Sequence, residues 1–158
     1  MAIRKIVTMG DEVLRKKSRP VVNFNEKLWQ LLDDMKDTMN KAEGVGLAAV
    51  QVGVLRRAIV IDVGDGLMEL INPEIIEVSG EQEGQEGCLS VPGRWGIVKR
   101  PNYVKLRAQN RKGQWKLYEG TELKARAFCH EIDHLDGTLY VDVETKELTA
   151  DEILAERN

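Results

Sequence analysis

The sequence contains few of the residues that bind transition metals or form disulfides: two histidines and two cysteines occur among 158 residues. Its start also lacks the apolar run of about 7–15 residues that is typical of a signal peptide. No run approaches the ~20 apolar residues of a membrane-spanning helix. We therefore expect a cytoplasmic protein with no membrane partner, in which both thiols are reduced and available for chemistry.

Charge of one sign is not in large excess either. The formal net charge is −3 at pH 7, which gives no electrostatic footprint for nucleic acid, so we expect no direct nucleic-acid partner. Hydrophobic residues make up 42% and charged residues 31% of the chain, as in ordinary globular proteins. The length suits one domain with a substantial core, which we assign to residues 1–158.

The first third of the chain predicts mainly helix. Residues 11–15 favour a single helical turn, and Asn25 is a suitable N-cap for a longer helix. We expect that helix to run to about Ala42 and to end at Gly44. Its apolar residues follow helical spacing, which predicts an amphipathic helix with one buried face; they are Leu28, Leu31, Leu32, Met35 and Met39.

The middle of the chain is rich in residues that favour strands. We expect strands over residues 57–63, 67–71, 74–78, 97–98, 103–108 and 115–118, with a break at Asn72-Pro73 and a hairpin turn at Lys112-Gly113. Residues 81–87 are polar and contain glycines, so we expect a loop there, and residues 150–157 predict a weak final helix. Strands in the middle, helices at both ends and no βαβ alternation predict an α+β fold with mainly antiparallel sheets packed around a buried helix.

Both histidines lie in His130-Glu131-Ile132-Asp133-His134, four residues apart. On an α-helix, residues i and i+4 have Cβ atoms about 5–6 Å apart, which suits two imidazoles that share one metal ion. This H-E-x-x-H pattern makes Glu131 the candidate general base. Thr121 is the expected N-cap of the helix and Gly137 its expected stop. The alternative is a pair of core histidines that are hydrogen-bonded to backbone carbonyls.

A third ligand is needed, and Cys88 is the best candidate. It follows a glycine, which allows a tight turn, and a thiolate with two imidazoles suits a borderline divalent metal. Cys129 neighbours His130 and so points about 100° away from the ligand face; we interpret it as a buried small apolar residue. A disulfide between Cys88 and Cys129 is not expected in a reducing compartment.

A segment of small residues precedes the strands: Gly44-Val45-Gly46-Leu47-Ala48-Ala49-Val50-Gln51. It matches the G-x-G-x-x-A pattern of dinucleotide-binding proteins, but a helix precedes it where a strand is required, so we reject that interpretation. Its backbone can instead approach another group closely. Leu123 and Ala127 share the helical face of His130 and would form the floor of an apolar pocket beside the metal, with Val45 as a wall.

Three motifs occur together in this order: residues 44–51, Glu86-Gly87-Cys88-Leu89-Ser90, and residues 130–134. In order and spacing they resemble the peptide deformylases, and Leu14-Arg15 and Pro20-Val21 extend the resemblance over nearly the whole chain. The resemblance implies an enzyme that removes the N-terminal formyl group from formyl-methionyl nascent polypeptides and releases formate.

The resemblance also implies roles for individual residues. Cys88, His130 and His134 would bind one divalent metal ion, Fe2+ in the cell, although Zn2+, Ni2+ or Co2+ also suit this ligand set. Gln51 and the backbone N–H of Leu89 would stabilise the oxyanion, and Gly46 would pair with the extended peptide. Some relatives contact the ribosome through a basic C-terminal helix; the tail beyond Val143 is mainly acidic here, which disfavours that mode.

Two other functions compete. The H-E-x-x-H pattern is also common in zinc metallopeptidases that cut internal peptide bonds. A non-enzymatic domain with a structural zinc would normally supply four protein ligands, and the sequence offers three. The sequence further predicts that Asp133, on the same helix, needs a charged partner if it is buried; Arg100 is our candidate.

Overall fold

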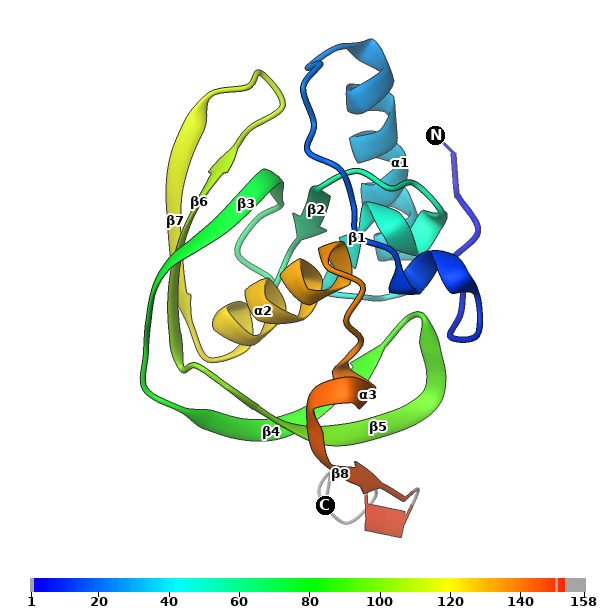
Figure 1. Cartoon of the computed structure of the whole chain (residues 1–158), viewed down its shortest axis with the longest axis vertical. Helices are drawn as coiled ribbons and strands as arrows, with labels where there is room; N and C mark the ends of the chain where they lie inside the picture. The colour runs from blue at the N-terminus through cyan, green and yellow to red at the C-terminus, as the bar shows by residue number, and fades with distance from the viewer. Residues whose placement is uncertain (1, 150, 153–158) are drawn as a thin grey trace.

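The structure is a computed structural model, and it describes residues 2–149 and 151–152. Helix α2 (Leu123–Leu135) lies near the centre and contacts strands of both sheets (Figure 1). Nine of its 13 residues are buried. The two histidines are on this helix, so the fold places them in the interior.

The larger sheet has five strands in the order β1-β2-β3-β6-β7, and every neighbouring pair is antiparallel. Strand β1 is at one edge, where Gly46 pairs with Ile61. The inner strand β2 is buried throughout. The five strands are β1 (Gly46–Ala48), β2 (Ala58–Ile61), β3 (Met68–Ser79), β6 (Tyr103–Gln109) and β7 (Trp115–Thr121).

The smaller sheet has three antiparallel strands in the order β4-β5-β8, and it lies below α2 in Figure 1. Its strands are β4 (Gln82–Cys88), β5 (Val91–Arg100) and β8 (Glu144–Leu148). Short helices complete the fold: η1 (Glu12–Arg15), η2 (Ala49–Val52) and α3 (Tyr140–Val143). The predicted α+β class with antiparallel sheets is confirmed.

Helix α1 (Glu26–Lys41) begins as predicted. The Asn25 side chain accepts a hydrogen bond from the Leu28 N–H at 3.2 Å, which satisfies one of the free donors at a helix N-terminus. The helix ends at Lys41, and Glu43 rather than Gly44 adopts the positive φ that follows it. Its apolar stripe is buried in a core shared with β1 and β2.

Two expectations in the strand region were wrong. Strand β3 continues through Asn72-Pro73. The ladder with β6 shifts register between Ile71 and Glu74, so no ladder hydrogen bond is required from the backbone nitrogen of Pro73. Asn72 has φ +52° and its side chain hydrogen-bonds both backbone groups of Val21. Residues 81–87, expected as a loop, form most of β4, which is held by its ladder with β5 instead of by an apolar pattern.

The start of α2 also differs from expectation. Thr121 ends β7, and Glu122, with φ +54°, precedes the helix without a side-chain cap. Gly137 follows the helix with φ +78°, as predicted for a left-handed stop. A Cβ at Gly137 would lie 2.5 Å from the Arg15 carbonyl oxygen, so this turn requires glycine. The helix expected over 150–157 lies mostly outside the described residues; strand β8 was not predicted.

Across residues 2–149 and 151–152, the structure has no helix of the length and apolarity needed to cross a lipid bilayer.

Candidate metal centre

The three predicted ligands converge at one point. Cys88 comes from the end of β4, while His130 and His134 come from successive turns of α2. Their ligand atoms all lie within 4.8 Å of one another, and Cys88 Sγ is 3.3 Å from His134 Nε2. A tetrahedral metal with bonds of about 2.0–2.3 Å separates its ligand atoms by about 3.3–3.6 Å. The donor set therefore fits one borderline divalent ion.

The two imidazoles are held in different ways. Their ring centroids are 5.0 Å apart with an interplanar angle of 73°, and the His130 ring also stacks against Tyr140. His134 is fully buried, and its Nδ1 has no hydrogen-bond partner within the described part of the chain. His130 Nδ1 lies 2.7 Å from Glu86 Oε1. Because a carboxylate can only accept, Nδ1 donates and Nε2 keeps the lone pair that a metal needs.

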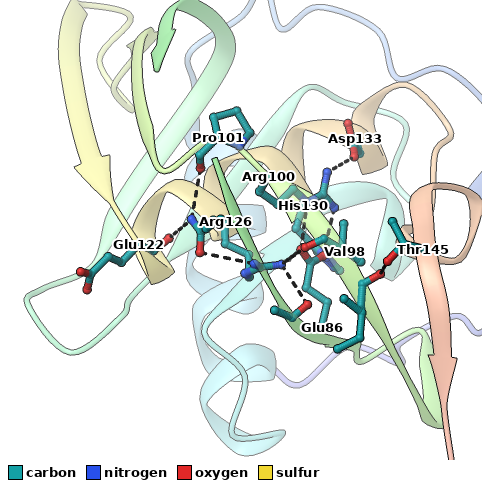
Figure 2. Close-up of polar contacts among 12 residues, drawn as sticks. Glu86, Val98, Arg100, Pro101, Glu122, Arg126, His130, Asp133 and Thr145 are labelled. Carbon is teal, nitrogen blue, oxygen red and sulfur yellow. Dashed lines mark hydrogen bonds and ion pairs between the residues drawn. The ribbon is translucent and has the colours of Figure 1, made fainter. Parts of the chain in front are cut away.

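Glu86 is the centre of a buried polar cluster (Figure 2). Its carboxylate accepts two hydrogen bonds from Arg100, at 2.9 and 3.0 Å, and one from Arg126 Nη1 at 2.6 Å, besides that from His130. Burial by itself would raise the pKa of Glu86, but the bonds from His130 and Arg100 outweigh it and hold that pKa well below its usual range. Glu86 therefore stays ionised, and its carboxylate orients the His130 ring.

From the sequence, Glu86 had no role beyond its place in the second motif, and residues 81–87 were expected to form a loop. The sequence positions of its two arginine partners could have indicated a buried carboxylate. Arg126 interrupts an apolar helical segment, and Arg100 ends a strand whose alternate residues are buried. Buried arginines require carboxylates, and β4 brings the nearest one to both.

The predicted partnership of Asp133 with Arg100 is confirmed. Arg100 Nη1 donates to Asp133 Oδ2 at 2.7 Å, and Figure 2 shows Arg100 reaching Asp133 on one side and Glu86 on the other. The Asp133 side chain is 32% exposed, so it is half-buried instead of fully buried as expected. Burial raises the pKa of Asp133 in spite of this partner.

Glu131 lies one residue after the first histidine, and it is buried. Its Oε1 has no hydrogen-bond partner among the residues that the structure describes, which is costly for a carboxylate unless a bound group completes the site. Burial raises the pKa of Glu131 to about 7. A carboxyl group near that pKa can both take and return a proton at neutral pH.

Gly46 explains how Glu131 fits. A Cβ at this position would lie 2.6 Å from Glu131 Oε2 and 3.0 Å from two carbons of the same side chain. Only glycine lets the backbone of β1 come this close to the carboxylate. The small-residue segment therefore brings an edge strand beside the candidate general base.

Gln51 has a fixed amide orientation. Its Oε1 accepts from the Ala48 N–H at 2.9 Å, and its Nε2 donates to Ser90 Oγ at 3.1 Å. The same Nε2 lies 3.6 Å from Cys88 Sγ. These contacts point the donor end of the amide toward the metal ligands. Ser90, which fixes that orientation, belongs to the second sequence motif, but no role of its own was assigned to it from the sequence.

A cavity of about 450 Å³ opens beside these groups. It brings together nearly all the predicted site residues; His134 does not line it and lies deeper. Arg94, Trp95 and Arg126 also line it and were not predicted. The predicted residues that line it are Val45, Gly46, Gln51, Cys88, Leu89, Leu123, Ala127, His130 and Glu131.

The electrostatics of the site favour a bound cation. Burial lowers the pKa of His134, so that ring stays neutral as a ligand must. Burial would lower the pKa of His130 too, but Glu131, Cys88 and Glu86 outweigh it and raise that pKa. The groups around His130 thus favour a positive charge at this position, which a bound divalent metal would supply. Cys129 is a free thiol whose pKa burial raises to about 11, as suits a core residue.

Comparison with known proteins agrees with this geometry. A family model described as polypeptide deformylase matches residues 3–149. A peptide deformylase of Caldicellulosiruptor bescii is 56% identical over 158 residues, covering 100% of this chain and 95% of the relative. One from Thermoanaerobacter pseudethanolicus is 58% identical over 142 residues, covering 90% and 89%.

Solved structures agree as well. The crystal structure of peptide deformylase from Thermotoga maritima has a TM-score of 0.90 and 40% sequence identity, and the match covers 92% of this chain and 99% of that one. A peptide deformylase from Legionella pneumophila gives 0.88 and 44%, covering 99% and 92%. The chain belongs to the polypeptide deformylase family.

Proposed function

We propose that this protein is a metal-dependent hydrolase that removes the formyl group from formyl-methionyl nascent polypeptides and releases formate. Family membership supports the reaction class. The observation that carries the proposal is a cluster of three candidate ligands, two of which line one cavity together with a buried carboxylate and an amide donor aimed at the ligands. One oxygen of that carboxylate has no hydrogen-bond partner among the described residues.

In this proposal Cys88, His130 and His134 hold the metal. When bound there, the ion would supply Lewis-acid chemistry and would lower the pKa of a water molecule. Glu131 takes the proton of the attacking water at Oε1 and returns it to the leaving amine. Gln51 Nε2 and the Leu89 N–H donate to the developing oxyanion, a contribution worth about 2.7–4 kcal/mol per donor in a comparable enzyme.

The edge position of β1 supports the proposed binding of an extended peptide. In the larger sheet β1 pairs with β2 on one side only, so Gly46 and its neighbours leave a backbone edge beside the cavity. A peptide can add to such an edge as a further strand. Leu123, Ala127 and Val45 would then enclose the unbranched methionine side chain.

The decisive assay is formate release from formyl-Met-Ala. We expect turnover of this dipeptide and no cleavage of unformylated peptides, which a metallopeptidase would cut. A structural zinc domain would release nothing, and it would need a fourth protein ligand that the described residues do not supply at this site.

Replacing Glu131 with Gln separates catalyst from scaffold. The change keeps the size and all three ligands, so the metal should stay bound while the proton carrier is lost. We expect deformylation per bound metal to fall by about 10²–10⁴-fold. Near wild-type turnover per bound metal would remove Glu131 from the mechanism, whereas loss of metal would give it a structural role.

We propose iron(II) as the working ion. Zinc, nickel and cobalt also suit one thiolate and two imidazoles, and affinity order alone does not select among them. A thiolate ligand beside iron is open to oxidation. We expect the iron protein to lose activity in air, and nickel or cobalt protein to keep it. Iron protein whose activity stays constant in air would count against this assignment.

A further inference from the structure

A short segment near the start of the chain contacts both elements that carry the proposed oxyanion donors. We call residues 7–9 the N-terminal segment; they precede η1 and belong to no helix or strand. The Val7 N–H donates to the backbone carbonyl of Gln51 at 2.8 Å, and the Met9 N–H donates to that of Ser90 at 2.7 Å. The segment therefore links η2 to the turn between β4 and β5.

These two bonds complete a ring of contacts. The Gln51 amide donates to Ser90 Oγ at 3.1 Å, so the two residues that accept from the N-terminal segment are also bonded to each other. Ser90 is fully buried and, with Leu89, connects β4 to β5. The position of η2 relative to this turn is thus set by one side-chain bond and two backbone bonds.

The chain is anchored on both sides of the N-terminal segment. Before it, the Arg4 N–H donates to Thr38 Oγ1 at 2.9 Å, and Arg4 Nε donates to Asp34 Oδ2 at 2.9 Å. Both partners are buried residues of α1. After it, Leu14 of η1 is buried in the core. With its ends held by α1 and by the core, the segment can restrain the two elements that it contacts.

The N-terminal segment itself buries little apolar surface. Thr8 is exposed, the Met9 side chain is 44% exposed, and Val7 is only partly buried where it packs against the core. Because the hydrophobic contribution scales with the apolar area that is buried, the two backbone bonds are the main interactions of this segment. Both bonds end on residues of the proposed oxyanion site, a placement that core packing does not require.

We propose that the N-terminal segment is a positioning element that fixes the distance between the Gln51 amide and the Leu89 N–H. The inference rests on the proposed function, in which these two groups donate to the developing oxyanion. Such donors act at about 2.7–3.1 Å from the oxyanion, and a misplacement of about 1 Å can cost about 100-fold in rate. Loss of a bond from the segment therefore slows turnover, although none of the described residues 7–9 lines the cavity.

Met9→Pro removes one of these bonds with little strain. The Asp11 N–H donates to the Thr8 carbonyl at 3.1 Å and Gly10 has φ +110°, so residues 8–11 match a type II turn with Met9 at its second position. Proline is favoured there because its ring holds φ near the value that the turn requires. The change thus deletes the N–H donor and keeps the turn. Met9→Ala is the matched control, since it removes the same side chain and keeps the N–H.

The first measurement is formate release from formyl-Met-Ala by full-length, metal-loaded protein, expressed per bound metal. We expect the kcat of Met9→Pro to fall at least about tenfold. Its KM should stay within about twofold, because the lost interaction is made only in the transition state. Met9→Ala should match the parent in kcat and KM. In a Gln51→Ala background, Met9→Pro should cause a smaller loss than in the parent, because both changes act on the same pair of donors.

The second measurement is backbone amide hydrogen exchange of the same metal-loaded proteins, followed by mass spectrometry, which requires no turnover. We expect faster exchange over residues 88–91 in Met9→Pro than in Met9→Ala, because the turn between β4 and β5 has lost a bond that holds it.

An unchanged kcat in Met9→Pro would overturn the proposal, as would an equal loss in both Met9 variants. Losses that multiply fully with that of Gln51→Ala would also overturn it, because the segment would then act independently of that donor. A fall in kcat that follows loss of bound metal would show a merely structural role. If the parent releases no formate while hydrogen exchange responds as expected, the proposed function fails and the contact between the segment and the turn stands.

Discussion

Replacing Glu86 with Gln tests whether the buried carboxylate orients the metal ligand. Glu86 accepts four hydrogen bonds, two from Arg100, one from Arg126 and one from His130. A glutamine side chain has the same shape but only one acceptor oxygen, and its amide group brings two donors. Wherever the amide nitrogen lies, it faces groups that also donate.

The consequences for stability and for the metal can be separated. Removing one partner of a buried ion pair costs about 3–5 kcal/mol, because the remaining charges lose their compensation. For a chain of this length, about 2–4 °C of melting temperature is lost per kcal/mol, so we expect a decrease of about 6–20 °C. If the amide nitrogen faces His130, that ring must move its proton to Nε2 and lose the lone pair for the metal. Changes in such supporting groups typically weaken metal affinity about 10–100-fold.

The assay combines thermal unfolding of the metal-free protein with competition for the metal by a chelator. Glu83→Gln on the same strand is the matched control: Glu83 is exposed, and its nearest cation, Lys99, is 3.9 Å away. We expect Glu83→Gln to match the parent in both measurements. A Glu86→Gln protein with parental melting temperature and metal affinity would refute the role assigned to this carboxylate.

Two further substitutions probe contacts of the site. Gly46→Ala should keep the metal but lower deformylation per bound metal at least tenfold, because the new Cβ would overlap the Glu131 carboxylate; normal turnover would mean that this carboxylate can shift at no cost. Asp133→Asn should lower the free energy of unfolding by about 1 kcal/mol, since a charge-assisted bond to Arg100 is lost from a half-buried site. The metal content of the Asp133→Asn protein should stay the same. An unchanged melting temperature would show that this bond adds nothing to stability.

The ligands could be predicted from the sequence because their geometry is local. The i, i+4 spacing of His130 and His134 is fixed by any α-helix, and the cap at Asn25 depends on one side chain and its own helix. The Arg100–Asp133 pair was accessible by a different argument, namely that a buried charge needs a partner.

The remaining errors arose where tertiary contacts override local pattern. Residues 82–88 have no apolar alternation, yet they form β4 because β5 supplies the ladder and α2 supplies the arginine that Glu86 needs. The chain passes Pro73 without leaving β3 because a register shift places the proline where no donor is required. Thr121 was expected to cap a helix, but it pairs with Tyr103 of β6 and is the last residue of β7. No single-segment pattern contains that information.

The positions of the site residues follow from the two-residue alternation of strand β4 and the four-residue spacing along helix α2. Successive residues of a strand point to opposite faces, and the burial of β4 follows this near its end: Glu86 is buried, Gly87 exposed and Cys88 partly buried. One strand face thus supplies both the thiol ligand and the carboxylate that supports the histidine.

Helix α2 supplies the complementary set at intervals of four residues. Arg126, His130 and His134 lie along one stripe, so the arginine that binds Glu86 and the two imidazoles share a single helical face. A rotation or slide of α2 relative to β4 would break the Glu86 contacts and the ligand geometry together. The buried ion cluster therefore couples the packing of the helix on the small sheet to the positions of the metal ligands, which is why we expect Glu86→Gln to change stability and metal affinity at once.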